Sequence, residues 1–164
     1  MSGEPGRRPR RDCRTAALAF LGRRAHPRRE LERKPLRGGH EAAEVTRTLD
    51  SLAAAGLLDE AATGAELGGF EGGRGRGSRR VAASLRARGV GEGDSARALG
   101  GSAGDEDGRL AAALEKKARS LPGGLTPVSR SRKLFDHLVR RGFDPAAVRE
   151  ALREKGDPTD DDPL

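Results

Sequence analysis

One short motif built around a glycine occurs three times in this chain, and it constrains the fold more than any other feature. The central glycines are Gly39, Gly89 and Gly142, which are 50 and 53 residues apart. An aliphatic residue stands eight positions before each glycine, and a leucine stands ten positions after it. Repetition at this period is typical of stacked helical units. The chain is therefore predicted to fold as a series of similar helical modules.

Each motif has the composition of a corner between two helices. Basic residues such as Arg37, Arg88 and Arg140 fall in the last turn of the first helix, where they complement the negative end of its dipole. The glycine after them suits the left-handed backbone conformation that ends many helices. After Gly142, Asp144-Pro145 supplies a capping residue and a proline at the first position of the next helix.

The spacing of apolar residues and helix-ending residues divides the chain into three modules of three helices each. Almost no segment alternates β-branched and aromatic residues with polar ones, so the fold class is all-α. The expected organisation is a disordered basic arm at 1–11, then repeat 1 at 12–56, repeat 2 at 57–104, repeat 3 at 105–154 and an acidic tail at 155–164.

The middle repeat has the weakest helical pattern. The ten residues from Gly68 to Gly77 include six glycines, and each glycine disfavours a helix by about 1 kcal/mol relative to alanine. The sequence therefore predicts that the first helix of this repeat fades near Leu67 and that 68–77 is poorly ordered. In repeat 1, Pro35 is expected to kink or end the second helix. Leucine, valine, isoleucine and phenylalanine make up only about 18 per cent of the chain, which predicts a loosely stabilised protein.

Charge and cysteine content limit the class of protein. The formal net charge is +7, which favours an anionic partner such as nucleic acid or an acidic protein surface. The single Cys13 excludes an internal disulfide and suits a reducing compartment. No apolar stretch is long enough for a signal peptide or a membrane span. We expect a soluble cytoplasmic protein, monomeric and without membrane contact.

Four stretches of the chain resemble the RecX family, bacterial modulators of the RecA recombinase. They are 23–31 (RRAHPRREL), 56–60 (GLLDE), 75–81 (GRGSRRV) followed by Leu85 and 88–90 (RGV), and Lys116-Lys117 followed by 138–143 (LVRRGF). No stretch is specific alone, but their order and spacing are typical of the family. Some positions differ from the family pattern: Pro35 replaces a leucine, and Ser95 replaces an aliphatic residue.

The resemblance implies three tandem three-helix repeats in an elongated, curved and basic molecule. It also implies binding in the groove of a RecA–DNA filament, inhibition of recombinase activity, and regulation of DNA repair, homologous recombination and the SOS response. Clusters of basic residues are candidates for the partner-binding surface: Arg79, Arg80, Arg86, Arg88, Lys116, Lys117, Arg130, Arg132, Lys133, Arg140 and Arg141. The same residues could instead be solvated helix faces that compensate helix dipoles.

The chain shows no sequence pattern for catalysis, a cofactor or a metal. The glycine- and arginine-rich run at 73–77 lacks the Gly-Lys-Ser/Thr ending of a nucleotide-binding loop, although it could touch phosphates as a flexible polycation. His26, His40 and His137 share no ligand spacing with Cys13. No nucleophile has a plausible base, so we predict that the protein is not an enzyme and has no cofactor.

Two alternatives to a RecA modulator stay open. A basic helical protein could bind nucleic acid directly through phosphate contacts, with weak and salt-dependent affinity. The chain has no Trp or Tyr and only four Phe, so it offers few side chains for stacking on bases. A partly degenerate family member whose middle repeat no longer folds would also have this composition.

Overall fold

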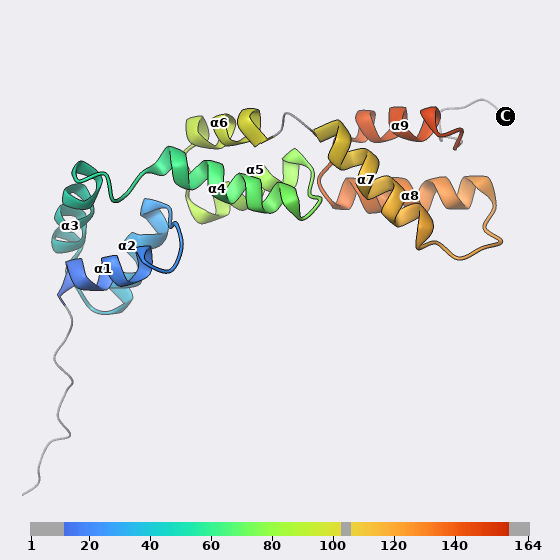
Figure 1. The fold of residues 1–164 in the computed structure, drawn as a ribbon. Helices are drawn as coiled ribbons and strands as arrows, with labels where there is room; N and C mark the ends of the chain where they lie inside the picture. Colours follow the sequence, from blue (N-terminus) through green and yellow to red (C-terminus); the bar gives the residue numbers. More distant parts are fainter. Residues whose placement is uncertain (1–11, 103–105, 158–164) are drawn as a thin grey trace, which may run out of the picture. The chain divides into compact units, whose positions relative to one another are not determined.

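A computed structural model describes residues 12–102 and 106–157, which form nine α-helices and no strand (Figure 1). The all-α prediction is confirmed. The predicted basic arm at 1–11, residues 103–105 of the linker and residues 158–164 of the acidic tail lie outside the described residues. In the described ranges, no helix is both long enough and apolar enough to cross a membrane.

The helices follow one another in three groups of three. The first group is α1 (Cys13–Leu21), α2 (Arg28–Arg37) and α3 (Ala42–Ala54). The second is α4 (Glu60–Gly73), α5 (Ser78–Arg88) and α6 (Glu92–Ser102), and the third is α7 (Glu106–Arg119), α8 (Pro127–Arg140) and α9 (Pro145–Glu154).

Each group has its own hydrophobic core of leucines and small residues. Leu31, Leu49 and Leu52 are fully buried in the first group. Leu134, Leu138, Phe143, Val148 and Leu152 form the centre of the third. The core of the second is smaller and consists of Leu67, Val81, Leu85, Val90 and Ala98, with Leu99 packed against it. The chain divides into two compact units, one ending at Thr63 and one beginning at Gly64.

The three motif glycines adopt the left-handed conformation that the sequence predicts. Their φ angles are 83° at Gly39, 86° at Gly89 and 90° at Gly142. At the end of α5, Gly89 donates its N–H to the carbonyl of Arg86, and Val90 donates to that of Leu85. These bonds satisfy carbonyls that would otherwise lack a partner where the helix ends.

The glycine-rich stretch is more helical than the sequence predicts. The prediction that helix fades near Leu67 is wrong, because α4 continues to Gly73. Leu67 is buried in the core of this group, and Gly64 packs closely against Val90 and against Asp94 of α6. Tertiary packing therefore offsets the low helix propensity. The buried Glu71 adds an ion pair with Arg76, just beyond the helix.

Pro35 also fails to end its helix, since α2 continues to Arg37. Proline lacks the N–H that would bond to the carbonyl four residues earlier, but only two helical residues follow Pro35, so the helix ends soon after it. The third helix of the middle repeat covers Glu92–Ser102.

Candidate partner-binding surface

A close backbone contact joins α5 to the corner between α8 and α9. The N–H of Gly77 donates to the carbonyl of Arg141 over 3.0 Å, and the N–H of Arg79 donates to that of Gly142 over 3.1 Å. A Cβ atom built on Gly77 would lie 2.3 Å from the carbonyl carbon of Gly142, so the two backbones could not approach this closely with a side chain between them. The contact therefore holds Arg79 of α5 near Arg141.

A cationic hollow lies beside this contact, in the unit that begins at Gly64. Its charged lining residues are Arg74, Arg109, Lys116 and Arg141, and the others are the small residues Gly72, Gly73, Gly75, Ala112 and Ala113. One guanidinium nitrogen of Arg141, Nη2, donates to the carbonyl of Arg74 over 2.8 Å, which fixes the position of that side chain. Among the described residues, the lining has four cationic side chains and no carboxylate, so the hollow suits an anionic group.

The positive charge continues onto the neighbouring parts of α7 and α8. Burial lowers the pKa of His137, and the charges of Arg141, Lys117 and Arg140 lower it further. This electrostatic effect places the predicted residues Lys117, Arg140 and Arg141 around one half-buried imidazole. Together with Lys116, four of the predicted partner-binding residues therefore gather at the C-terminal ends of α7 and α8.

The predicted residues of α5 divide between its two ends. Arg79 and Arg80 lie at the N-terminal end, where Arg79 forms an exposed ion pair with Asp144 over 3.3 Å. Arg86 and Arg88 lie in the last turn, where they complement the helix dipole. An α-helix rises about 1.5 Å per residue, so the two pairs are roughly 10 Å apart along the axis. They do not form a single cluster.

Comparison with known proteins identifies the family. The regulatory protein RecX of Halorhodospira halophila is 38% identical to this chain over 143 residues, which cover 84% of each protein. The chain belongs to the RecX family. RecX of Pelodictyon phaeoclathratiforme is 34% identical over 140 residues, covering 85% of this chain and 86% of the relative. The family model for the third three-helix domain of RecX matches residues 105–152.

Solved structures of RecX show the same fold. RecX from Lactobacillus salivarius superposes with a TM-score of 0.77 at 16% identity, covering 87% of this chain and 93% of that structure. The identification of the family from short sequence stretches is confirmed. The match to the third RecX domain covers α7, α8 and most of α9. The matched residues include Lys116, Lys117, Arg140 and Arg141.

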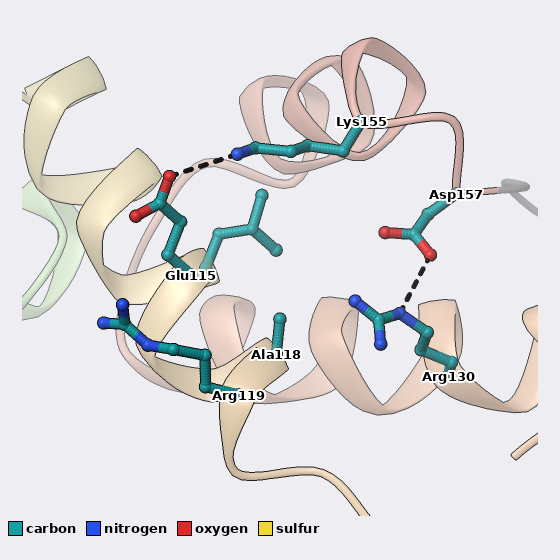
Figure 2. Close-up of a pocket in the computed structure, with 7 residues that line it drawn as sticks. Glu115, Ala118, Arg119, Arg130, Lys155 and Asp157 are labelled. Carbon is teal, nitrogen blue, oxygen red and sulfur yellow. Dashed lines mark hydrogen bonds and ion pairs between the residues drawn. The ribbon is translucent and has the colours of Figure 1, made fainter. Parts of the chain in front are cut away.

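The remaining predicted residues of this RecX protein lie along α8. Arg132 and Lys133 are exposed. Arg130 lines a separate pocket between α7, α8 and the end of α9, which Figure 2 shows. There Arg130 is ion-paired with Asp157 over 3.3 Å, and Lys155 with Glu115 over 3.2 Å. This pocket contains both signs of charge, so it is less suited to an anionic partner than the cationic hollow.

Two cationic residues of the hollow, Arg74 and Arg109, are absent from the sequence-based set. Arg74 lies in the glycine-rich run, which the sequence indicated only as a flexible polycation. Arg109, Ala112, Ala113 and Lys116 follow the spacing of one helix face, so the pattern i, i+3, i+4, i+7 gives the signal for Arg109. An exposed aromatic residue stands nearby: Phe70 is 59% exposed, with the guanidinium of Arg74 5.5 Å from the centre of its ring.

Proposed function

We propose that this RecX protein binds a RecA-type recombinase filament through the cationic hollow and lowers its recombinase activity, thereby regulating DNA repair and recombination. Membership of the RecX family supports the choice of partner. The observation that carries the choice of surface is the hollow itself, in which four cationic side chains meet.

The hollow has the chemistry that a nucleoprotein filament requires of its ligand. A filament presents DNA phosphates and protein carboxylates, and arginine binds both groups through paired N–H donors. Arg109 and Arg141 are half-buried, so less side-chain entropy is lost when they bind an anion than for a fully mobile side chain. Lys116 is exposed beside them and adds a charge that can reach outward. We expect a monomer that acts in the same compartment as the recombinase.

The test is RecA-dependent ATP hydrolysis and strand exchange on single-stranded DNA, measured as this protein is added. We expect both rates to fall as its concentration rises. Lys116→Glu should raise the concentration needed for half-inhibition by roughly tenfold, since it reverses a charge in a cluster of like charges. Lys155→Glu is the matched control, because Lys155 is also an exposed lysine but lies outside the hollow, against Glu115.

Unchanged RecA rates at several-fold molar excess would exclude the proposed function. Equal effects of Lys116→Glu and Lys155→Glu would instead show that net charge matters and the hollow does not. Direct phosphate binding is the second candidate, and the same hollow favours it. Tight binding to DNA without RecA, weakening steeply with salt, would support that candidate.

A further inference from the structure

The structure brings the only cysteine of the chain together with a histidine and a glutamate. Cys13 is the first residue of α1, whereas His40 lies just before α3 and Glu44 in its first turn. One ligand atom from each residue lies within 4.8 Å of the ligand atoms of the other two. The sequence did not indicate this cluster, because 27 residues separate Cys13 from His40 and no metal-binding spacing relates them.

We propose that Cys13, His40 and Glu44 bind a divalent transition-metal ion, with Zn²⁺ as the best match. Thiolate, imidazole and carboxylate are the three ligand types that Zn²⁺ uses in proteins. A thiolate and a carboxylate together balance the charge of a divalent cation. Mg²⁺ and Ca²⁺ prefer oxygen ligands alone, so this set selects against them.

The distances fit a tetrahedral ion. Zn–N and Zn–O bonds of about 2.0–2.2 Å place neighbouring ligand atoms of a tetrahedron about 3.4 Å apart. His40 Nδ1 and Glu44 Oε2 are already 3.4 Å apart. Because the Zn–S bond is longer, Cys13 Sγ and the His40 nitrogen should lie about 3.6 Å apart. The ligand atoms already lie within 4.8 Å of one another, so a side-chain movement of about 1 Å brings the sulfur into place.

Burial also distinguishes the two sides of the site. Cys13 is only 3% exposed and belongs to the core of the first helix group, and the His40 side chain is 9% exposed. The Glu44 side chain is 44% exposed, so an ion can enter on that side and keep a water as its fourth ligand. Asp12, which caps α1, adds negative charge close enough to His40 to interact with it electrostatically.

The experiment uses the untagged full-length protein after treatment with a chelator. Co²⁺ is titrated in place of Zn²⁺, because a cobalt–thiolate bond gives a charge-transfer absorption band in the near ultraviolet. We expect one equivalent of Co²⁺ to produce the band and Zn²⁺ to abolish it by displacement. Zn²⁺ should also raise the melting temperature, since it binds the folded state.

Four variants assign the ligands. Cys13→Ser should abolish the band, and His40→Gln and Glu44→Gln should each weaken Co²⁺ binding by roughly tenfold or more. Glu41→Gln is the matched control, because it removes the same charge from an exposed neighbour on the same helix end and should leave binding unchanged. Circular dichroism checks that each variant is folded, and if Cys13→Ser unfolds, the two glutamine variants decide.

Absence of the band at stoichiometric Co²⁺ would overturn the proposal. A band that survives in Cys13→Ser, or that is equally strong in the His40 and Glu44 variants, would also overturn it. The His40–Glu44 contact would then be an ordinary ion pair at the start of a helix.

Discussion

The backbone N–H of Ser78 donates a hydrogen bond to Oε1 of Glu106 over 2.8 Å, and the Ser78 hydroxyl donates to the other carboxylate oxygen. The same arrangement occurs earlier in the chain, where the N–H of Arg28 donates to Oε1 of Glu60 over 2.5 Å. Glu60 and Glu106 are the first residues of α4 and α7. In both cases, a carboxylate that begins one three-helix group caps the second helix of the group before it.

Removal of these inter-group caps should destabilise the protein. We expect Glu106→Ala and Glu60→Ala each to lower the free energy of unfolding by about 1–2 kcal/mol, because each leaves a helix-terminal N–H without its charged acceptor. Urea unfolding followed by circular dichroism measures the change. Glu66→Ala, at an exposed position of α4, is the control and should change stability by less than about 0.5 kcal/mol. Equal midpoints for Glu106→Ala and Glu66→Ala would contradict the capping role.

The glycine contact beside the hollow gives a second prediction with an internal control. Gly77 has φ −75°, which any residue can adopt, so its need for glycine comes from the close backbone of Gly142 and Phe143. Gly77→Ala should therefore destabilise by about 1–3 kcal/mol or more, as overpacking does. Gly69→Ala places the same methyl group where nothing lies within 4 Å, and should stabilise α4 by about 0.5–1 kcal/mol. Opposite shifts in melting temperature are expected, and shifts of the same sign would contradict this interpretation.

Much of the fold follows from local sequence signals. The corners at Gly39, Gly89 and Gly142 were predictable because a helix end with a left-handed residue strongly favours glycine. The boundaries of α5 and α8 follow from Gly89 and from the Thr126-Pro127 start in the same way. These signals lie within a few residues of the structure that they determine, so one sequence is enough to reveal them.

The remaining features depend on contacts between residues that are far apart in the chain. The continuation of α4 to Gly73 accompanies the burial of Leu67 and Glu71, and propensity alone predicts the opposite. The cationic hollow joins Arg74 and Arg141, which are 67 residues apart. Sequence reasoning found Lys116 and Arg141 by charge and family resemblance, but it could not tell that Arg130 would be ion-paired elsewhere.

The weak core of the middle group can be strengthened at one position. Ser95 is 6% exposed, and its hydroxyl has no hydrogen-bond partner among the described residues. The equivalent positions, six residues after the other two motif glycines, are the buried Val45 and Val148. Ser95→Val should raise the free energy of unfolding by about 1–2 kcal/mol, since it replaces an unpaired buried hydroxyl with apolar groups.

The reverse change tests the equivalence of the repeats. Val148→Ser places a hydroxyl in the core of the third group and should destabilise by about 1–3 kcal/mol. Guanidinium unfolding of both variants against the wild type measures the two effects. Destabilisation by Ser95→Val would show that the site has no room for the larger side chain, and would contradict the proposed equivalence.

The buried His26 and the half-buried His137 should make stability depend on pH. Burial lowers the pKa of His26, although a hydrogen bond with Glu30 opposes the effect, and the nearby charges of Lys34 and Arg24 lower it further. Lys34 Nζ lies 3.4 Å from Nε2 of His26. The same ammonium lies 3.3 Å from Nδ1, and a positive charge this close to the ring favours the neutral imidazole. The pKa of His137 is also lowered, first by burial and then by the arginines and lysine around it.

The direction of the pH effect follows from these pKa values. In the unfolded chain both histidines titrate near pH 6.5, above their folded values, so below that pH the unfolded state binds more protons. The stability that the two neutral histidines contribute to the fold is fully present above about pH 7 and is lost as the pH falls through about 6.5. The melting temperature should therefore fall as the pH is lowered from about 7 to about 5.5. The double variant His26→Gln/His137→Gln should show a smaller change in melting temperature over the same range. A wild-type melting temperature that is constant over this range, or a double variant that falls as steeply, would show that the two imidazoles are not held neutral by the fold.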